Sequence, residues 1–169
     1  MDDAAVTRAP QGREQPWSDE TVERGQVVVV TDNPIARAAV TIAEAAGRRT
    51  VLLADEGEGP TPLEWIEDHP LAERDAFVLC DHDTPDMDRL LRAALDGRAG
   101  YVAMLGSRRR AEMVFADLER SLPAGTLERL HVPAGLDVGG KAPGEIALSV
   151  VAEIVAHSYG RSGGPMRRR

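Results

Sequence analysis

A chain of 169 residues, 43% of them hydrophobic, is long enough to form one domain with a substantial buried core. Its formal net charge of -8 argues against nucleic-acid binding, which needs a basic surface. The single cysteine, Cys80, excludes an internal disulfide and a zinc site built from cysteines. No apolar run approaches the roughly 18 residues of a membrane span, and the N-terminus lacks the apolar segment of a signal peptide. We therefore expect a cytoplasmic protein without a membrane partner.

The two ends of the chain differ in composition from its middle. Residues 1–24 are rich in charged residues, proline, glycine and glutamine and follow neither a strand nor a helix period, which predicts a mobile arm. Residues 161–169 combine glycine, serine and proline with four arginines and predict a basic flexible tail. A single domain is expected at residues 25–160.

Within that domain, short apolar runs alternate with amphipathic segments. Continuous β-branched or apolar runs predict strands at residues 26–31, 50–54, 76–80 and 101–105, with a short fifth strand at 131–133. Helices are expected after each of them. The first helix starts at Pro34 behind a cap at Asp32 or Asn33, and its predicted buried stripe is Ile35, Ala39, Ile42 and Ala46.

This alternation predicts an α/β fold, a Rossmann-like doubly wound parallel sheet with right-handed crossovers and strand order 3-2-1-4-5. In such a sheet the ligand crevice lies at the carboxyl ends of the strands where the order reverses. For this order the reversal lies between strands one and four. The two loops expected to matter most are therefore residues 31–34 and residues 106–109.

The loop after the first strand has lost the glycines of a dinucleotide site. Such a site needs G-x-G-x-x-G for the tight turn and for the approach of the pyrophosphate. Here residues 31–36 contain no glycine, Asp32 adds a negative charge, and Pro34 removes an N–H donor. The sequence therefore argues against NAD(P) binding. Asp55, after the second strand, is either the carboxylate that would bind a ribose or a residue that caps its own loop.

The loop after the fourth strand is better suited to an anion. Gly106 and Ser107 lead into a helix that begins with three arginines, so free backbone N–H groups and the positive end of the helix dipole face the crevice. Ser107 is predicted to cap the helix, Arg108 and Arg109 to bind phosphate, and Arg110 to point into solvent. The alternative is a capped helix with solvated arginines.

A second glycine-rich turn, GLDVGG at residues 135–140, leads through Pro143 and Glu145 into the last helix. Gly135 and Gly139 permit positive φ angles or close backbone approach, and Glu145 suits the helix start. Asp137 could cap the turn. The alternative function of the turn is structural, to seat the last helix on the sheet.

The segments YVAMLGSRRR and HVPAGLDVGGKAPGEIALSVVAEI, at residues 101–110 and 131–154, resemble the C-terminal domain of the XdhC/CoxI family. Members are accessory proteins that mature molybdenum-cofactor enzymes such as xanthine dehydrogenase. The resemblance covers residues 25–159. Full-length members carry a further N-terminal domain with a glycine- and cysteine-containing motif, which this sequence does not match, so we expect a stand-alone half or a diverged paralogue.

The resemblance implies a protein that binds molybdenum cofactor (molybdopterin), hands it over or contacts the client enzyme, without a catalysed reaction of its own. Asp137 would then accept a hydrogen bond from a pterin amine. The implied partners are a molybdenum hydroxylase and a cysteine desulfurase, and a homodimer is expected. The candidate cofactor-binding residues are Asn33, Gly106, Ser107, Arg108, Arg109, Gly135, Asp137 and Gly139.

The third strand ends in an acidic segment, CDHD at residues 80–83, whose His-Asp pair matches the family pattern. Asp83 or Thr84 is predicted to cap the next helix, with Asp86 and Asp88 in its first turn; the alternative is a Mg²⁺ or Mn²⁺ site. Cys80 is either a buried small residue or a sulfur carrier.

Two functions from other classes stay open beside the accessory role. One is a nucleotide- or NAD(P)-binding oxidoreductase or sensor on the same fold, against which the missing glycines count. The other is a scaffold that keeps the fold and a protein-interaction surface but binds no small molecule.

Overall fold

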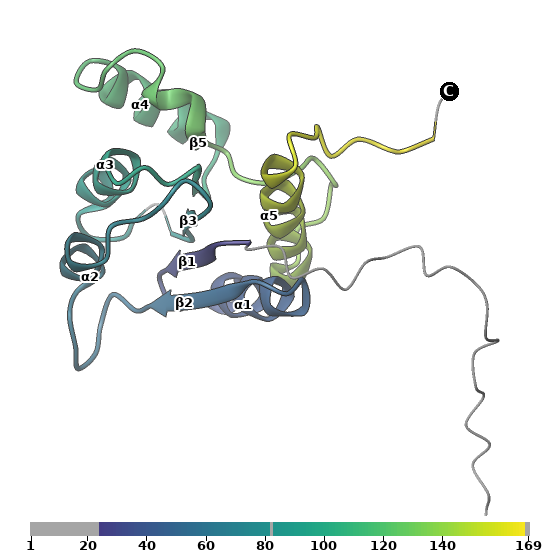
Figure 1. The fold of residues 1–169 in the computed structure, drawn as a ribbon, viewed down its shortest axis with the longest axis horizontal. Coiled ribbons are helices and arrows are strands. Elements are labelled where there is room, and N and C mark those ends of the chain that lie inside the picture. The colour runs from purple at the N-terminus through teal and green to yellow at the C-terminus, as the bar shows by residue number, and fades with distance from the viewer. Residues whose placement is uncertain (1–23, 82, 168–169) are drawn as a thin grey trace, which may run out of the picture.

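Five parallel strands form the centre of the fold in a computed structural model, which describes residues 24–81 and 83–167 (Figure 1). Of the predicted N-terminal arm only Arg24 is described, and His82, Arg168 and Arg169 also lie outside the described residues. The strands are β1 (Gln26–Val30), β2 (Arg49–Leu53), β3 (Ala76–Leu79), β4 (Tyr101–Met104) and β5 (Leu130–His131).

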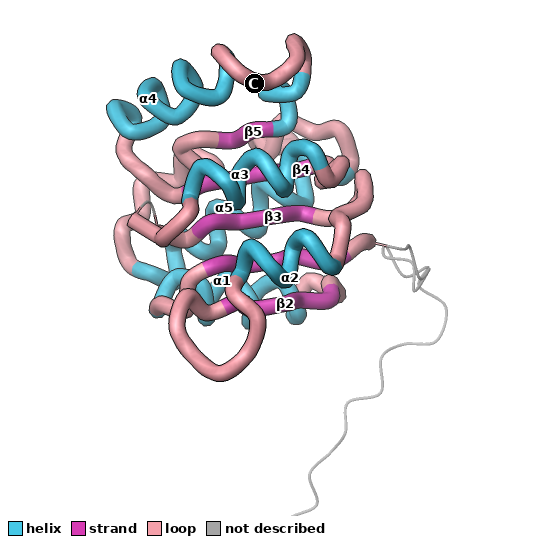
Figure 2. Tube along the Cα trace, turned by 90° about the vertical axis from the view of Figure 1, so that its left-hand side faces the viewer, coloured by secondary structure: helices cyan, strands magenta, loops and turns pink. Residues whose placement is uncertain are grey.

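The Rossmann-like, doubly wound parallel sheet is confirmed, and its strand order is β2-β1-β3-β4-β5 (Figure 2). The order differs from 3-2-1-4-5 in the position of β3, because Val28 of β1 pairs with Val51 of β2 on one side and with Phe77 of β3 on the other. Burial explains the difference. All four residues of β3 are buried, whereas Leu52 of β2 is 38% exposed. The composition of β2 therefore suits an edge strand of the sheet, and that of β3 suits a central strand with neighbours on both sides.

The helices cover the sheet in two layers (Figure 1). On one face α1 (Pro34–Ala45) packs against α5 (Pro143–Ser158). The other face carries α2 (Pro62–Asp68), α3 (Met87–Asp96) and α4 (Arg108–Glu119), followed by the short 3₁₀ helix η1 (Thr126–Arg129). Each face of the sheet therefore has its own apolar core. None of the helices in the described part of the chain has the length and hydropathy to cross a bilayer.

The buried stripe of α1 differs from the predicted one. Ala36, Ala39 and Ala43 are buried, whereas Ile35 and Ile42 are half-buried and Ala46 is exposed. Since alanine carries only a methyl group, this stripe lets α1 lie close to the sheet and to α5 at the same time. In α3 and α4 the apolar side chains of the core are buried, and Met87 and Phe115, which pack against them, are half-buried.

Each helix after a strand runs back across the sheet, as parallel crossovers require. The N-termini of α1, α3, α4 and α5 therefore lie at the carboxyl edge of the sheet, and the C-termini of α1 and α5 lie at its amino edge. The hydrogen bond between His157 Nε2 of α5 and the Gly100 carbonyl, just before β4, fixes the second of these positions (3.0 Å).

Candidate site at the carboxyl edge of the sheet

The start of α4 has the predicted capped geometry. Ser107 is the N-cap, and its Oγ accepts a hydrogen bond from the Arg110 backbone N–H (3.2 Å). The N–H groups of Arg108 and Arg109, in the first turn, have no acceptor within the helix and point out of its end. Gly106 shows no steric need for glycine, because an added Cβ would make only ordinary contacts with Met104 and Arg110.

The three arginines of this turn differ in environment. Arg108 and Arg109 are exposed and form no hydrogen bond or ion pair with any other residue that the structure describes. Arg110 is half-buried, with Nη2 4.0 Å from Met87 Sδ. The prediction that Arg110 points into solvent is therefore wrong, because α4 turns this position toward α3. The two cations available to a ligand are Arg108 and Arg109.

The turn after β5 is held against α5. Gly135 has φ +102°, and an added Cβ would fall well inside van der Waals contact with Ser149 Oγ. The N–H of Gly135 donates to Glu153 Oε2 (2.8 Å), and that of Leu136 donates to the Ser149 carbonyl (3.2 Å). This part of the turn thus seats α5, as the structural alternative expected.

Beyond Leu136 the same turn is open to solvent. Asp137 is exposed, and Gly139 has φ +80° with free space around the position of a Cβ. Glu145 Oε2 accepts hydrogen bonds from the N–H groups of Lys141 and Ala142 and so stabilises the start of α5. A ligand can therefore reach Asp137 and Gly139, whereas the N–H of Gly135 is already bonded.

Glu153 joins the turn to the sheet through a group of side chains that the sequence did not indicate. Its carboxylate accepts from the Tyr101 hydroxyl (2.6 Å), and His131 Nδ1 lies 3.5 Å from Oε1. The Tyr101 ring stacks on His131 and meets His157 edge-on. No local pattern of the sequence reveals the group, because its members lie on three separate elements, β4, β5 and α5.

The pKa values of this group follow from its bonds. Burial would raise the pKa of Glu153, but hydrogen bonds from His131, Tyr101 and Gly135 outweigh it and lower the value to about 2. Burial, followed by the bond to Glu153, raises the pKa of Tyr101. Glu153 is therefore a carboxylate and Tyr101 a neutral donor near pH 7.

The connection after β1 is filled by its own side chains. Asn33 is the N-cap of α1: its Oδ1 accepts from the Ala36 N–H (2.9 Å), and its Nδ2 donates to the Cys80 carbonyl (3.1 Å). Thr31 has φ +79°, a rare conformation for a β-branched residue, and its hydroxyl lies 2.6 Å from that of Thr84, which is 6% exposed. These bonds span the ends of β1 and β3, where the strand order reverses.

Asp32, whose charge was expected to oppose a pyrophosphate, forms an ion pair with Arg37 (2.6 Å). The hydrogen bond from Arg37 lowers the pKa of Asp32. Asp55 does not show the predicted capping bond at Oδ1, since this atom is buried and has no hydrogen-bond partner among the described residues.

The acidic segment after β3 departs from the predicted cap. Asp86, with φ +57°, occupies the N-cap of α3 and forms no side-chain capping bond, so the assignment of this position to Asp83 or Thr84 is wrong. Asp81 Oδ1 accepts from the Asp83 N–H. Within residues 24–81 and 83–167, no three His, Cys, Asp or Glu side chains are placed to hold a metal ion.

Cys80 is 5% exposed, and burial together with the neighbouring Asp81 carboxylate raises the pKa of its thiol to about 12. The thiolate that sulfur transfer requires is therefore disfavoured. The geometry agrees with the alternative of a buried small residue.

The tertiary structure brings some of the predicted site residues together and separates others. The Ala134 N–H donates to the Met104 carbonyl (3.1 Å), which places the turn at Gly135 beside the connection that carries Gly106 and Ser107. Asn33 lies in the connection after β1, and β3 lies between β1 and β4. The strand order thus reverses between β1 and β3, whereas Arg108 and Arg109 follow β4, the strand on the other side of β3.

A five-stranded parallel sheet with helix N-termini and two glycine-containing turns at its carboxyl edge defines a Rossmann-like domain. A family model described as the XdhC Rossmann domain matches residues 27–154, and the chain therefore belongs to the XdhC family. It is 32% identical over 123 residues to the uncharacterized protein YqeB of Escherichia coli (strain K12), a match that covers 70% of this chain and 21% of YqeB.

Among solved structures, the fold is similar to that of a xanthine dehydrogenase (BH1974) from Bacillus halodurans, with a TM-score of 0.67 and 22% sequence identity. That match covers 82% of this chain and 44% of the other. The chain thus spans less than half the length of both proteins, and the structural similarity concerns the fold.

Proposed function

We propose that this chain is an accessory protein in the maturation of molybdenum hydroxylases of the xanthine dehydrogenase or CO dehydrogenase type. In this function it binds molybdenum cofactor, hands it over or contacts the client enzyme, in the cytoplasm. Membership of the XdhC family supports the general role. The cofactor is cargo here, and its redox chemistry belongs to the client enzyme.

The observation that carries the proposal is the pair of uncommitted cations at the start of α4. Arg108 and Arg109 are exposed beside the free N–H groups of the first turn, and Ser107 already caps the helix. The cofactor presents a pterin-linked phosphate and an oxo-metal end, both anionic, and guanidinium groups can bind such oxygens with two parallel hydrogen bonds. The charge and the donor set fit the cofactor.

The other candidate residues differ in the hydrogen-bonding groups that they can offer to a bound cofactor. Asp137 and Gly139 are accessible in the neighbouring turn, and Asp137 offers an acceptor for a pterin amine. Asn33 fits less well, because both ends of its amide are already hydrogen-bonded. Gly135 contributes by holding the turn in place rather than by offering its N–H.

The geometry favours this role over dinucleotide binding. The position of a glycine-rich phosphate loop is occupied by the Thr31–Thr84 pair and by the ion pair of Asp32 with Arg37. A pyrophosphate would have to displace these bonds and approach the negative charge of Asp32. A scaffold without any small-molecule ligand remains the alternative, and retention of the cofactor distinguishes the two.

The test is an anaerobic retention experiment. The chain is mixed with molybdenum cofactor released from a donor enzyme and separated by rapid filtration, and bound pterin is measured by fluorescence after oxidation, with NADH as competitor. We expect stoichiometric retention insensitive to NADH, and at least a roughly tenfold weaker affinity in the Arg108→Gln, Arg109→Gln double variant.

Arg120→Gln is the matched control, because Arg120 is an exposed arginine just beyond the other end of the same helix. Equal retention by the control and the double variant would remove the proposed site. No retention by the unmodified chain would support the scaffold alternative instead.

A further inference from the structure

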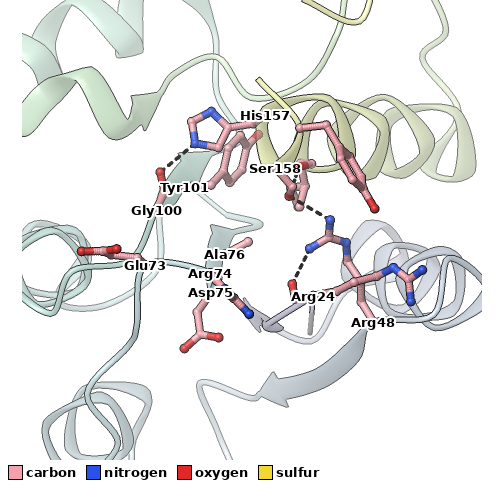
Figure 3. A pocket seen from close by; sticks show the side chains of 12 residues that line it. Arg24, Arg48, Glu73, Arg74, Asp75, Ala76, Gly100, Tyr101, His157 and Ser158 are labelled. Atoms are coloured by element: carbon pink, nitrogen blue, oxygen red, sulfur yellow. Dashed lines mark hydrogen bonds between the residues drawn. The ribbon is translucent and has the colours of Figure 1, made fainter. Parts of the chain in front are cut away.

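A cavity lies at the edge of the sheet opposite to the proposed site, where β3 and β4 begin and α5 ends (Figure 3). Its volume is about 360 Å³, within the range of small-molecule sites. Tyr101 and Ile154 supply apolar wall, and His157 and Ser158 come from the end of α5. The cavity is separate from the proposed site at the start of α4.

Arg48 is the main charged group in the wall of this cavity. It is 4% exposed, and its guanidinium donates to the Arg24 carbonyl and to Ser158 Oγ, both at 2.8 Å (Figure 3). Its Nε is buried and has no hydrogen-bond partner in the described part of the chain, and no carboxylate there forms an ion pair with the side chain. A buried cation without a counter-ion is costly.

The other charges around the cavity leave this cation uncompensated. Asp75 accepts from the backbone N–H groups of Gln26 and Ala72, and Glu73 pairs with Arg98. Neither carboxylate pairs with Arg48. Desolvation is the main cause that lowers the pKa of Arg48, and the neighbouring Arg24 also lowers it.

The ends of two helices also act on the cavity. The C-termini of α1 and α5 face this edge, and each carries roughly half a negative charge from the helix dipole. Together they offset about one positive charge. Arg24 and Arg74 also line the cavity, and within the described residues neither Arg24 nor Arg48 forms an ion pair with a carboxylate.

We propose that this cavity binds an oxyanion group, the phosphate or carboxylate of a small molecule, at the cationic wall formed by Arg24 and Arg48. The bound anion supplies the missing counter-charge, and the apolar wall at Tyr101 and Ile154 accommodates the remainder of the molecule. The site is independent of the proposed cofactor site, which lies at the other edge of the sheet.

Nuclear magnetic resonance of the ¹⁵N-labelled full chain tests this proposal with inorganic phosphate and, in a parallel titration, acetate. Ionic strength is held constant with sodium chloride. We expect saturable shifts at the amides of Gly100 and Ser158 and at Arg48 Nε, with a Kd on the order of 1 mM for the bare anion. The comparison of phosphate with acetate identifies the preferred group.

Arg24→Gln is the main variant, because Arg48 donates to the Arg24 backbone carbonyl, which the substitution keeps. We expect this variant to weaken binding about tenfold, a loss of one charge-assisted contact. The Arg108→Gln, Arg109→Gln double variant is the control, and the shifts at Gly100 and Ser158 should persist in it. Ser158→Ala, which removes an acceptor of Arg48 and leaves a further N–H for the anion, provides a second variant if Arg24→Gln fails to fold, and binding should strengthen in it.

Three results would overturn the proposal. They are the absence of saturable shifts at these amides with both anions, equal shifts with chloride, and an affinity that is neither weakened by Arg24→Gln nor strengthened by Ser158→Ala.

Discussion

The connections after β1 and after β4 both carry the chain from a buried strand into a helix, yet they differ in what they leave available. After β1, the side chain of Asn33 donates a hydrogen bond to the Cys80 carbonyl, and the hydroxyl of Thr31 is hydrogen-bonded to that of Thr84. After β4, Arg108 and Arg109 keep their guanidinium groups uncommitted within the described residues. The position where a Rossmann fold usually binds its ligand is thus filled by internal hydrogen bonds, and the proposed site follows β4, two strands away from β1 in the sheet.

The turn after β5 falls between these two cases. Its first half is fixed by Glu153 and Ser149, and its second half, at Asp137 and Gly139, is exposed. A connection at this edge can therefore serve the fold and offer groups to a ligand, provided that different residues do the two tasks. Substitutions that affect only the residues that hold the fold, or only those exposed to a ligand, test this comparison.

The largest effect is expected for Gly135→Ala. A side chain there is strained by φ +102° and would collide with Ser149 Oγ, so we expect a loss of about 3 kcal/mol in the free energy of unfolding. Gly139→Ala is the matched control: it has a similar φ but free space, and we expect about 1 kcal/mol. Urea denaturation measures both, and equal losses would show that Gly135 is not held by close contact with α5.

A smaller effect is expected from the titration of Glu153. Its pKa in the folded protein is about 2, below its ordinary value of 4.5, so the carboxylate stabilises the fold above pH 4.5. That contribution is lost as the pH falls from about 4.5 to about 2, and we expect about 2 kcal/mol after allowance for solvent screening. Glu153→Gln should remove this part of the pH dependence of unfolding, and an unchanged profile in the variant would contradict the assignment.

A still smaller effect than that of Glu153 is expected for Asn33→Ala, which removes the cap of α1 and the bond to Cys80. We expect a loss of about 1.5 kcal/mol in the free energy of unfolding. The Arg108→Gln, Arg109→Gln double variant should change stability by less than about 0.5 kcal/mol, because these side chains have no bonds to lose within the described residues. A loss in the double variant as large as that in Asn33→Ala would contradict the contrast between the two connections.

Local sequence patterns predicted the elements of this fold well, because a strand or a helix start depends on neighbouring residues. The continuous run at Val27–Val30 appears as a buried strand, and Asn33 and Ser107 cap the helices that were predicted to follow them. Glu145 also stabilises the start of α5 as expected. The two motifs that suggested the XdhC family lie within the segment that the family model matches.

Patterns were less informative where a residue had two plausible environments. All three arginines of α4 fit an exposed first turn in sequence, and only the packing of α4 against α3 makes Arg110 half-buried. Ile35 and Ile42 are the more hydrophobic residues of α1, but alanines face the sheet because the helix must also contact α5 closely.

The sequence by itself determined the α/β class, the order of elements along the chain and the family, since these depend on local periodicity and contiguous motifs. The tertiary structure alone decided which strands are neighbours, because β3 reaches the centre of the sheet only through competition for burial with β2. It also brought together Tyr101, His131 and Glu153, which lie on separate elements. These side chains contact one another only when β4, β5 and α5 are packed together. Such contacts arise from packing across the whole domain, which no local pattern of residues encodes.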